Sequence, residues 1–292
     1  MIASPVNWQA YVAVGLIFTT AHTTMATPVL STRQATGCTR EALLKAADSY
    51  VAAQTAGKLD SLSGLLASNW TYEENAKVIS VAKALISKPL KIDNRRSIVD
   101  TVACASFTEL IVTDPANPHV IGTQLRHTPD GLSITLIDSI TSTTGAWLFN
   151  AKNTLEYARQ EKWDPIPEDK RDKREFIKAA GDAYLDLWSD KDAVNRVPWA
   201  NGAPCVRLEG GAYTGGPGKP VDTCKSGIPS NSSQAPNVRR RYVIDEIYGS
   251  VNIFNDWLHM RDAIDSHEFR LENSKLRYIH TITSCGDHAC RL

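Results

Sequence analysis

Apolar residues recur at helical spacing in two places along the chain. In the first, one helical face is formed by Leu43, Leu44, Ala47, Tyr50 and Val51. Thr39 can cap the start of this helix, Glu41 suits its first turn, and Gly57 lies just past its end. In the second, the face is formed by Phe176, Ile177, Ala180, Tyr184, Leu187 and Trp188. The pattern predicts one helix near the start of each half of the chain.

A loop-rich segment and then paired strand patterns follow each helix, first over about 119–163 and again over about 239–283. In the last hairpin of each half, Leu155-Glu156-Tyr157 matches Leu276-Arg277-Tyr278. The prolines of 164–169 break both neighbouring patterns. We therefore expect an α+β fold of two tandem cone-shaped domains, residues 38–164 and 170–285. Each would be a curved antiparallel sheet packed with helices around an apolar pocket.

Side-chain alternation assigns residues of the first half to a sheet face once the turn is placed. A turn at 128–131 groups His127, Leu132, Leu125, Ile134, Thr123, Leu136, Ile121 and Asp138. Asp138 is then a carboxylate at the end of an apolar wall, where burial would raise its pKa and suit it to acid or base chemistry. The alternative is a strand-end aspartate that reaches solvent.

The second half yields two such groups. A turn at 249–250 places on one face Tyr242, Ile244, Glu246, Tyr248, Val251, Ile253 and Trp257. A turn at 273–274 groups His267, Phe269, Leu271, Leu276, Tyr278, His280 and Ile282. This register sets His267 opposite His280. The residues that would then lie on the outer, solvated face are Glu268, Arg270, Glu272, Lys275 and Arg277.

These faces supply the candidate site of the second half. The candidate catalytic residues are His280, Glu246, His267 and Tyr278. The candidate substrate-binding residues are Tyr242, Tyr248, Trp257, Phe269 and, from the first half, Asp138. A histidine on an apolar face is also compatible with a satisfied core residue, so both interpretations of the histidine pair stay open.

The N-terminus matches a signal peptide, residues 1–26. The apolar run 11–18 is too short to span a bilayer but long enough for a signal core, and Thr24 and Ala26 suit cleavage after Ala26. A buried helix is the alternative, but it would leave the threonine-rich stretch 19–27 with nothing to pack against. We expect a protein of the secretory pathway, secreted or vesicular, with no membrane association after cleavage.

Six cysteines follow the cleavage point, and an even number in an oxidising compartment predicts three disulfides. We expect Cys38 to pair with Cys104 and the other four to pair within the second half, namely Cys205, Cys224, Cys285 and Cys290. Two N-glycosylation acceptors, Asn69 and Asn231, fit the same compartment.

Charge and motifs exclude several classes of function. The 32 basic residues equal the 32 acidic ones, which argues against a nucleic-acid or anionic-lipid partner. The sequence has no G-x-S-x-G or H-E-x-x-H motif, and the glycine-rich stretch 210–219 lacks P-loop spacing. The segment 285–290 faintly suggests a metal knuckle, although disulfide use is favoured. We predict no cofactor, no metal, and small apolar molecules as partners.

Three segments resemble a known family: 205–211, 240–246 and 265–270 with its continuation 276–283. They look like the C-terminal domain of secreted fungal proteins of the ketosteroid-isomerase-like (SnoaL-like) cone superfamily, and the first half resembles a more diverged cone of the same superfamily. The two-domain length, signal peptide and cysteine pattern are similar to those of the hetero-Diels-Alderases of fungal tropolone-sesquiterpenoid pathways.

The resemblance implies a cofactor-independent pericyclase of secondary metabolism. It would join a tropolone quinone methide to a humulene-type sesquiterpene mainly by holding the two partners together. The face assignments, and not the resemblance, supply the roles: His280, Tyr278 or His267 would polarise the heterodiene oxygen, and Glu246 or Asp138 would assist dehydration. Two alternatives remain: an acid–base dehydratase or isomerase of another natural product, and a non-catalytic secreted binder whose pockets are filled by its own aromatic side chains.

Overall fold

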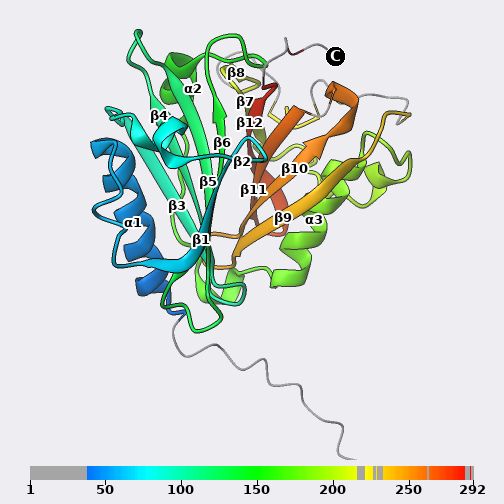
Figure 1. Cartoon of the computed structure of the whole chain (residues 1–292). Helices are drawn as coiled ribbons and strands as arrows, with labels where there is room; N and C mark the ends of the chain where they lie inside the picture. Colours follow the sequence, from blue (N-terminus) through cyan, green and yellow to red (C-terminus); the bar gives the residue numbers. More distant parts are fainter. Residues whose placement is uncertain are drawn as a thin grey trace, which may run out of the picture. The chain divides into compact units, whose positions relative to one another are not determined.

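The structure is a computed structural model of the chain, and it describes residues 38–215, 221–225, 228, 233–261, 263–286 and 290. The predicted signal peptide and the acceptor Asn231 lie outside the described residues. Residues 34–292 cluster as one compact unit that contains two six-stranded sheets (Figure 1). Within the described part of the chain, no helix is both long and apolar enough to cross a membrane.

The first sheet is built from residues 66–142. Its strands are β1 (Leu66–Glu74), β2 (Lys77–Val78), β3 (Asn94–Asp100), β4 (Ala105–Val112), β5 (His119–His127) and β6 (Ile134–Ser142), in the order β2-β1-β6-β5-β4-β3. Strands β3 to β6 form an antiparallel meander, and β1 joins β6 in parallel. Helix α1 (Arg40–Ala56) packs on β3 and β4, with the short helices η1 (Val81–Lys83) and η2 (Leu85–Ser87) nearby.

The second sheet repeats this plan. Its strands are β7 (Val206–Glu209), β8 (Ala212–Tyr213), β9 (Asn237–Asp245), β10 (Ser250–Trp257), β11 (Ala263–Glu272) and β12 (Lys275–Ser284), in the order β8-β7-β12-β11-β10-β9. Strand β7 pairs with β12 in parallel, as β1 does with β6. Helix α3 (Arg174–Asp186) covers β9, β10 and β11. The predicted α+β fold of two tandem sheet-and-helix domains is confirmed, with mixed rather than purely antiparallel sheets.

Helix α1 has the ends that its sequence predicts. The Thr39 hydroxyl accepts a hydrogen bond from the backbone N–H of Ala42 at 3.2 Å. Gly57 ends the helix with φ of 65°, a left-handed conformation that glycine adopts without a steric penalty, and its N–H bonds to Ala53 O. Helix α3 is also confirmed, although its N-cap, Lys173, makes no side-chain capping bond.

The strand predicted for 151–158 is wrong, because these residues form helix α2 (Ala151–Ala158). The side chain of Asn150 caps this helix by accepting from the N–H of Asn153. The helix packs against β7 and β8, where the Thr154 hydroxyl donates to Gly210 O. The matching sequences 155–157 and 276–278 therefore lie in a helix and in a strand, respectively. The two halves resemble each other in the order of their elements and not in this sequence match. The remaining short helices are η3 (Glu168–Lys170), η4 (Ala193–Asn195) and η5 (Leu258–Met260).

A bulge changes the predicted faces of β11 and β12. The two-residue turn at Asn273 and Ser274 is confirmed, with positive φ at both residues. The register then shifts: Leu271 pairs with Leu276, but the next pair is Arg270 with Tyr278. Because the extra residue reverses the alternation beyond it, Tyr278 and His280 lie on the face opposite to Leu276. The predicted pairing of His267 with His280 is wrong, since His280 pairs with Glu268 and His267 with Thr281.

A similar register shift changes the predicted face of Asp138 in the first half. A register shift between Arg126 and His127 makes Asp138 the partner of Gln124. Asp138 therefore lies on the other face of the sheet from Leu125, and it does not end the apolar wall. The predicted turn at 128–131 is present, closed by the N–H of Gly131 donating to Thr128 O at 2.7 Å, and it lies within the longer loop between the end of β5 at His127 and the start of β6 at Ile134.

Glu246 and Tyr248 do not join the apolar face predicted for them. They belong to a turn closed by the N–H of Gly249 donating to Glu246 O, before β10 starts at Ser250. Glu246 is exposed and accepts a hydrogen bond from the N–H of Arg174 at the start of α3. Tyr248 packs instead against the cluster between the two sheets, with the Arg40 guanidinium 5.3 Å from its ring centre.

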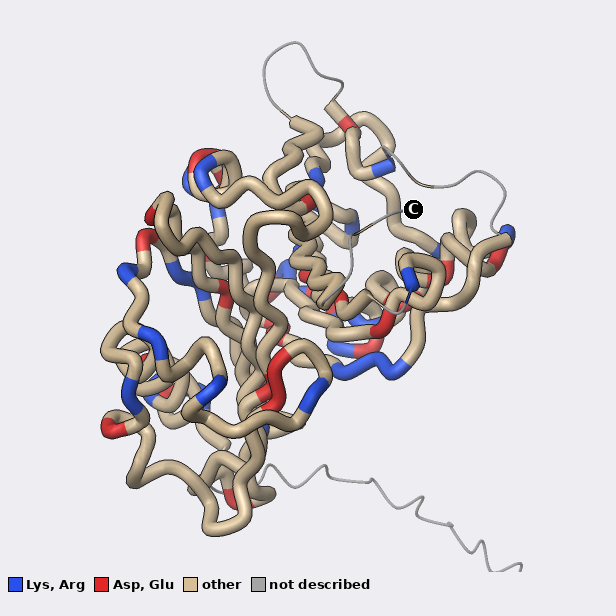
Figure 2. Tube along the Cα trace, turned by 45° about the horizontal axis from the view of Figure 1, so that its top comes forward, with Lys and Arg blue, Asp and Glu red and all other residues tan. Residues whose placement is uncertain are grey.

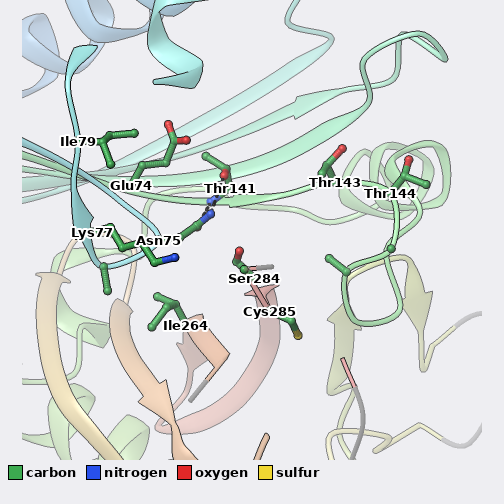
Figure 3. Close-up of a pocket in the computed structure, with 14 residues that line it drawn as sticks. Glu74, Asn75, Lys77, Ile79, Thr141, Thr143, Thr144, Ile264, Ser284 and Cys285 are labelled. Atoms are coloured by element: carbon green, nitrogen blue, oxygen red, sulfur yellow. Dashed lines mark hydrogen bonds between the residues drawn. The ribbon is translucent and has the colours of Figure 1, made fainter. Parts of the chain in front are cut away.

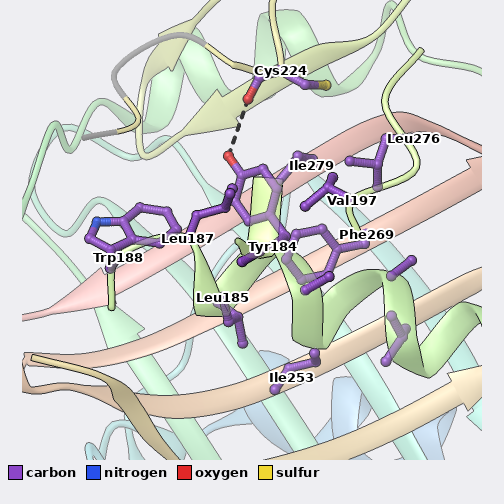
Figure 4. Packing of buried hydrophobic residues seen from close by; sticks show 14 of the residues in the cluster. Tyr184, Leu185, Leu187, Trp188, Val197, Cys224, Ile253, Phe269, Leu276 and Ile279 are labelled. Atoms are coloured by element: carbon purple, nitrogen blue, oxygen red, sulfur yellow. Dashed lines mark hydrogen bonds between the residues drawn. The ribbon is translucent and has the colours of Figure 1, made fainter. Parts of the chain in front are cut away.

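The inner face of the second sheet is packed with the protein's own side chains (Figure 4). Tyr184 of α3 lies at the centre of this core, with its ring 5.1 Å from that of Phe269. Its hydroxyl donates to Cys224 O at 3.2 Å and accepts from Arg207 at 3.0 Å. The surrounding aromatic residues are Trp188, Trp199 and Trp257.

All three predicted disulfides are confirmed. Cys38, just before α1, is joined to Cys104 in the turn between β3 and β4. In the second half, Cys205 pairs with Cys224 and Cys285 with Cys290. The last two bonds each close a short loop, whereas the first ties α1 across 66 residues to the sheet it covers.

The two sheets pack against each other through the faces that α1 and α3 leave uncovered, with contacts between β3 and β9 and between β6 and β12 (Figure 1). An apolar cluster fills part of this interface, led by Phe107 and Phe254, whose ring centres are 6.1 Å apart. Charged residues of both signs are interspersed over the chain (Figure 2), and several of them are buried here. Glu268 and Arg270, which were predicted to face solvent, are therefore buried, whereas Lys275 is exposed as predicted.

His280 is at the centre of a buried charged layer in this interface. Its Nδ1 lies 2.9 Å from Glu109 Oε2 and its Nε2 lies 2.6 Å from Glu161 Oε2, and all three side chains are at most 3% exposed. Arg96 pairs with Glu268 at 2.5 Å and lies 3.6 Å from Glu109. Burial alone would lower the pKa of His280, but Glu161 and Glu109 raise it to about 10, so the ring is a cation at neutral pH.

This geometry predicts a fall in stability at alkaline pH. The folded-state pKa of His280, about 10, exceeds the ordinary value of 6.5, so its stabilisation is complete below pH 6.5 and is lost as the pH rises through 10. The unfolding free energy of the wild type, from urea titrations, should decline over this window. His280→Gln should be about 3–5 kcal/mol less stable at pH 6, because two buried carboxylates lose their cation.

The exposed His259 offers the matched control, since His259→Gln removes the same chemical group from the surface. The unfolding free energy of His259→Gln should decline with pH as that of the wild type does, and that of His280→Gln should decline less. A flat wild-type profile between pH 6.5 and 10 would contradict the assignment of His280 as a buried cation.

Candidate functional site

A cleft with a volume of about 810 Å³ is formed by both halves of the chain (Figure 3). The first half contributes the turn between β1 and β2, the end of β6 and the loop after it. The second half contributes the start of β11 and the end of β12. The residues that define its walls are Glu74, Asn75, Thr141, Thr143, Ile264 and Ser284. This volume falls within the range of small-molecule sites.

The turn between β1 and β2 forms a rigid wall of the cleft. Asn75 and Ala76 both have positive φ, 49° and 59°. The Asn75 side chain binds Thr141 twice: its Oδ1 accepts from the backbone N–H at 2.8 Å and its Nδ2 donates to the hydroxyl at 3.1 Å. A left-handed conformation at alanine costs about 1–2 kcal/mol, so these bonds to β6 hold a strained turn in place.

Glu74 is the acidic residue of the cleft wall. It ends β1, and the Tyr72 hydroxyl donates to its Oε2 at 2.9 Å while the backbone N–H of Leu85 donates to the same oxygen at 2.8 Å. Burial and the neighbouring Glu74 both raise the pKa of Tyr72, so the phenol keeps its proton at neutral pH. Among the described residues, both hydrogen bonds to the carboxylate end on Oε2, which leaves Oε1 available to a ligand.

A chain of buried hydroxyls lies behind Glu74, inside the first sheet. The Tyr50 and Thr123 hydroxyls are 2.6 Å apart, and those of Thr123 and Ser139 are 2.8 Å apart. Burial raises the pKa of Tyr50 to about 12, and Glu74 contributes to the same direction. Ser139 acts in the opposite direction on the pKa of Tyr72 and partly offsets its rise. The apolar core of the first half therefore contains a buried chain of hydroxyls, whereas the core of the second half is packed with aromatic rings.

The structure does not bring the four predicted catalytic residues together. His280 and Tyr278 lie in the interface between the sheets, where Tyr278 stacks on Trp163 and its hydroxyl accepts from the N–H of Lys162. Glu246 is on the surface, as described above. His267 lies inside the second sheet, 2.5 Å from Asp265 and stacked on Phe269. Their catalytic roles stay predictions.

The predicted substrate-binding residues are also dispersed. Trp257 and Phe269 belong to the core of the second half, and Tyr248 to the interface. Tyr242 is half-buried at the edge of α3, and its hydroxyl donates to Asp182 at 2.8 Å. Asp138 is fully buried and pairs with Arg241 at 2.7 Å; burial raises its pKa, in the predicted direction, although Arg241 opposes the rise.

The pattern of β1 could have revealed Glu74 before the structure. Trp70, Tyr72 and Glu74 alternate along the chain, which is the spacing of side chains on one face of a strand. The segment lies between the predicted elements of the first half, and Asn69 within it is exposed, as a glycosylation acceptor must be. The positions of Thr141 and Ser284 on the same cleft could not have been found in this way, because no local sequence pattern links these residues to Glu74.

One group of possible metal ligands lies close together in the described part of the chain: Cys205, Asp222 and Cys224. The two cysteines are joined in a disulfide, so they have no thiolate to offer. Cys285 and Cys290 are likewise paired, as the disulfide interpretation of that segment predicted.

Comparison with known proteins adds little to this geometry. Residues 170–283 match a family described as a domain of unknown function, DUF8021. No curated protein matches the chain. Among solved structures, an NTF2-like protein from Bacteroides fragilis matches with 11% identity over 85% of this chain and 98% of its own, at a TM-score of 0.19. So low a score carries no argument about fold or function, and the fold rests on the strand order given above.

Proposed function

We propose that the chain is a cofactor-independent enzyme that performs acid–base chemistry on a small organic molecule in the cleft, with Glu74 as the general base. One observation carries this proposal: a carboxylate at the wall of a large cleft is held on one oxygen by Tyr72 and Leu85 N–H. A base must be oriented, and it must keep an oxygen free for the proton it takes. Such a site fits the dehydratase or isomerase interpretation of the sequence.

The chemistry would be removal of a proton from a carbon beside a carbonyl group. Glu74 takes the proton, and the electron pair moves into an enolate. A hydroxyl on the next carbon then leaves and takes that proton from Glu74 to become water, or Glu74 returns the proton at another carbon. Asn75 and the hydroxyls of Thr143 and Ser284 lie around the cleft and would hydrogen-bond the polar groups of the substrate. Tyr72 is a positioning residue, because its hydroxyl already donates to Glu74.

Proton exchange tests this function before the substrate is known. A panel of cyclic and terpenoid hydroxyketones, incubated with the protein in deuterated buffer, should include members that gain deuterium beside the carbonyl. Glu74→Gln should slow this exchange about 10²- to 10⁴-fold, because general-base catalysis contributes that much. The glutamine still accepts the hydrogen bond from Leu85, so the fold should be unchanged by circular dichroism. Mass spectrometry measures the exchange.

Glu73→Gln is the matched control, since the adjacent residue on β1 points to the opposite face and is absent from the cleft wall. It should exchange at the wild-type rate. Exchange that persists unchanged in Glu74→Gln, or that no panel member undergoes with the wild type, would count against Glu74 as a base.

The hetero-Diels-Alder reaction expected from the resemblance to secreted fungal enzymes is the second candidate. The volume of the cleft favours it, because about 810 Å³ lies near the upper end for small-molecule sites and leaves room for two reactants. The reaction would then occur in this cleft and not in the second cone, with Glu74 assisting the loss of water that forms the quinone methide and the hydroxyls of Thr141 and Thr143 binding its oxygen.

A product assay tests this second candidate. The protein is mixed with a hydroxymethyl tropolone and a hydroxylated humulene, and chiral chromatography follows the adduct against a heat-denatured control. A single stereoisomer formed above the background rate, and lost in Thr141→Val, is the expected result. A racemic adduct at the background rate, with folded protein, would reject this substrate pair.

A further inference from the structure

A second pocket, of about 520 Å³, has a wall of positively charged side chains. It lies where the first half, through Ala103 and Arg126, meets α3 and β9 of the second half. Its polar lining residues are Arg126, Arg174, Lys178, Arg241 and Tyr242, and the lining contains no acidic residue. The pocket therefore presents four cations and a phenol to whatever enters it.

Three carboxylates stand behind this wall. Asp100 holds Arg174 through two hydrogen bonds of 2.7 and 2.6 Å, and it is completely buried. Asp138, also buried, pairs with Arg241, as described above. Asp182 pairs with Lys178 at 2.6 Å, but it is shared with Arg240, a cation outside the pocket, at 2.9 Å. Four cations thus face the pocket, and three carboxylates, one of them shared, compensate them.

Arg126 is the one of these four cations that forms no ion pair with any of the three carboxylates. Within the described part of the chain, its guanidinium donates to neutral groups, Tyr242 O at 3.0 Å and the Gln124 side-chain oxygen. Burial lowers its pKa and Arg241 adds to that effect, although Asp138 and Asp100 act against it. Arg126 therefore has capacity to bind negative charge that no carboxylate of the described residues uses through a hydrogen bond.

We propose that this pocket binds the oxyanion group of a small anionic ligand: a carboxylate, sulfate or phosphate. Arginine forks match the oxygen spacing of such groups and bind them through two parallel hydrogen bonds. An anion here would compensate Arg126, and the half-buried wall would strengthen the attraction relative to open solvent. The site is separate from the cleft of Glu74 and independent of the function proposed there.

Isothermal titration calorimetry with inorganic phosphate, sulfate and acetate tests this site. Chloride at the same ionic strength serves as the baseline, so that general screening is removed. The wild type should bind at least one of the three oxyanions saturably with one site per chain. The comparison of acetate with phosphate and sulfate distinguishes a carboxylate ligand from a phosphorylated or sulfated one.

Arg126→Gln should weaken this binding at least tenfold. Arg95→Gln is the matched control, because Arg95 forms an exposed pair with Asp48 outside the pocket and its replacement changes the net charge equally. It should bind as the wild type does. Arg126→Lys keeps the charge and loses the fork, so it should bind with intermediate affinity.

Melting temperatures measured with and without oxyanion separate loss of binding from a loss of stability in the variant. Without added oxyanion, the melting temperature of each variant is its own reference, because Arg126→Gln also removes the hydrogen bonds of Arg126 to Tyr242 O and Gln124. With phosphate or the preferred oxyanion, the melting temperature should rise in the wild type and in Arg95→Gln but not in Arg126→Gln. Absence of saturable binding to the wild type, or equal binding to Arg126→Gln, would overturn the proposal.

Discussion

The packing of two sheets through a buried layer of paired charges is the constraint on which the rest of the structure depends. Each charge in that layer has been removed from water, so it must meet a partner at hydrogen-bonding distance or cost several kcal/mol. His280 satisfies this requirement with Glu109 from the first sheet and Glu161 from the segment after α2. A shift of one sheet along the other would separate these partners.

Such a layer adds less to stability than an apolar interface of the same area would, because desolvation offsets much of the attraction between the charges. Its consequence here is geometric. The cleft beside Glu74 and the basic pocket beside Arg126 are both formed by residues from the two halves, so each exists only in this arrangement. Arg174 and Asp100, which join α3 to the end of β3, belong to the same set of pairs between the halves.

Local signals made much of the fold predictable. Caps at Thr39 and Gly57 mark α1, turn residues at Asn273 and Ser274 mark the last hairpin, and the cysteine count fits three disulfides. The positions of the candidate site residues were harder to predict, because one bulged residue in β12 reverses the face of His280 without changing the local sequence pattern. Alternating charges such as those of 268–277 also look the same whether water or another sheet covers them.

Side-chain NMR of His280 tests the central claim most directly. In protein labelled with ¹⁵N on histidine, the His280 signals are assigned by their loss in His280→Gln and recorded at pH 8. The paired geometry predicts protons on both ring nitrogens, with the ¹⁵N shifts of an imidazolium, because the pKa is about 10. A neutral ring that carries one proton at pH 8 would contradict the account of a charged layer between the sheets.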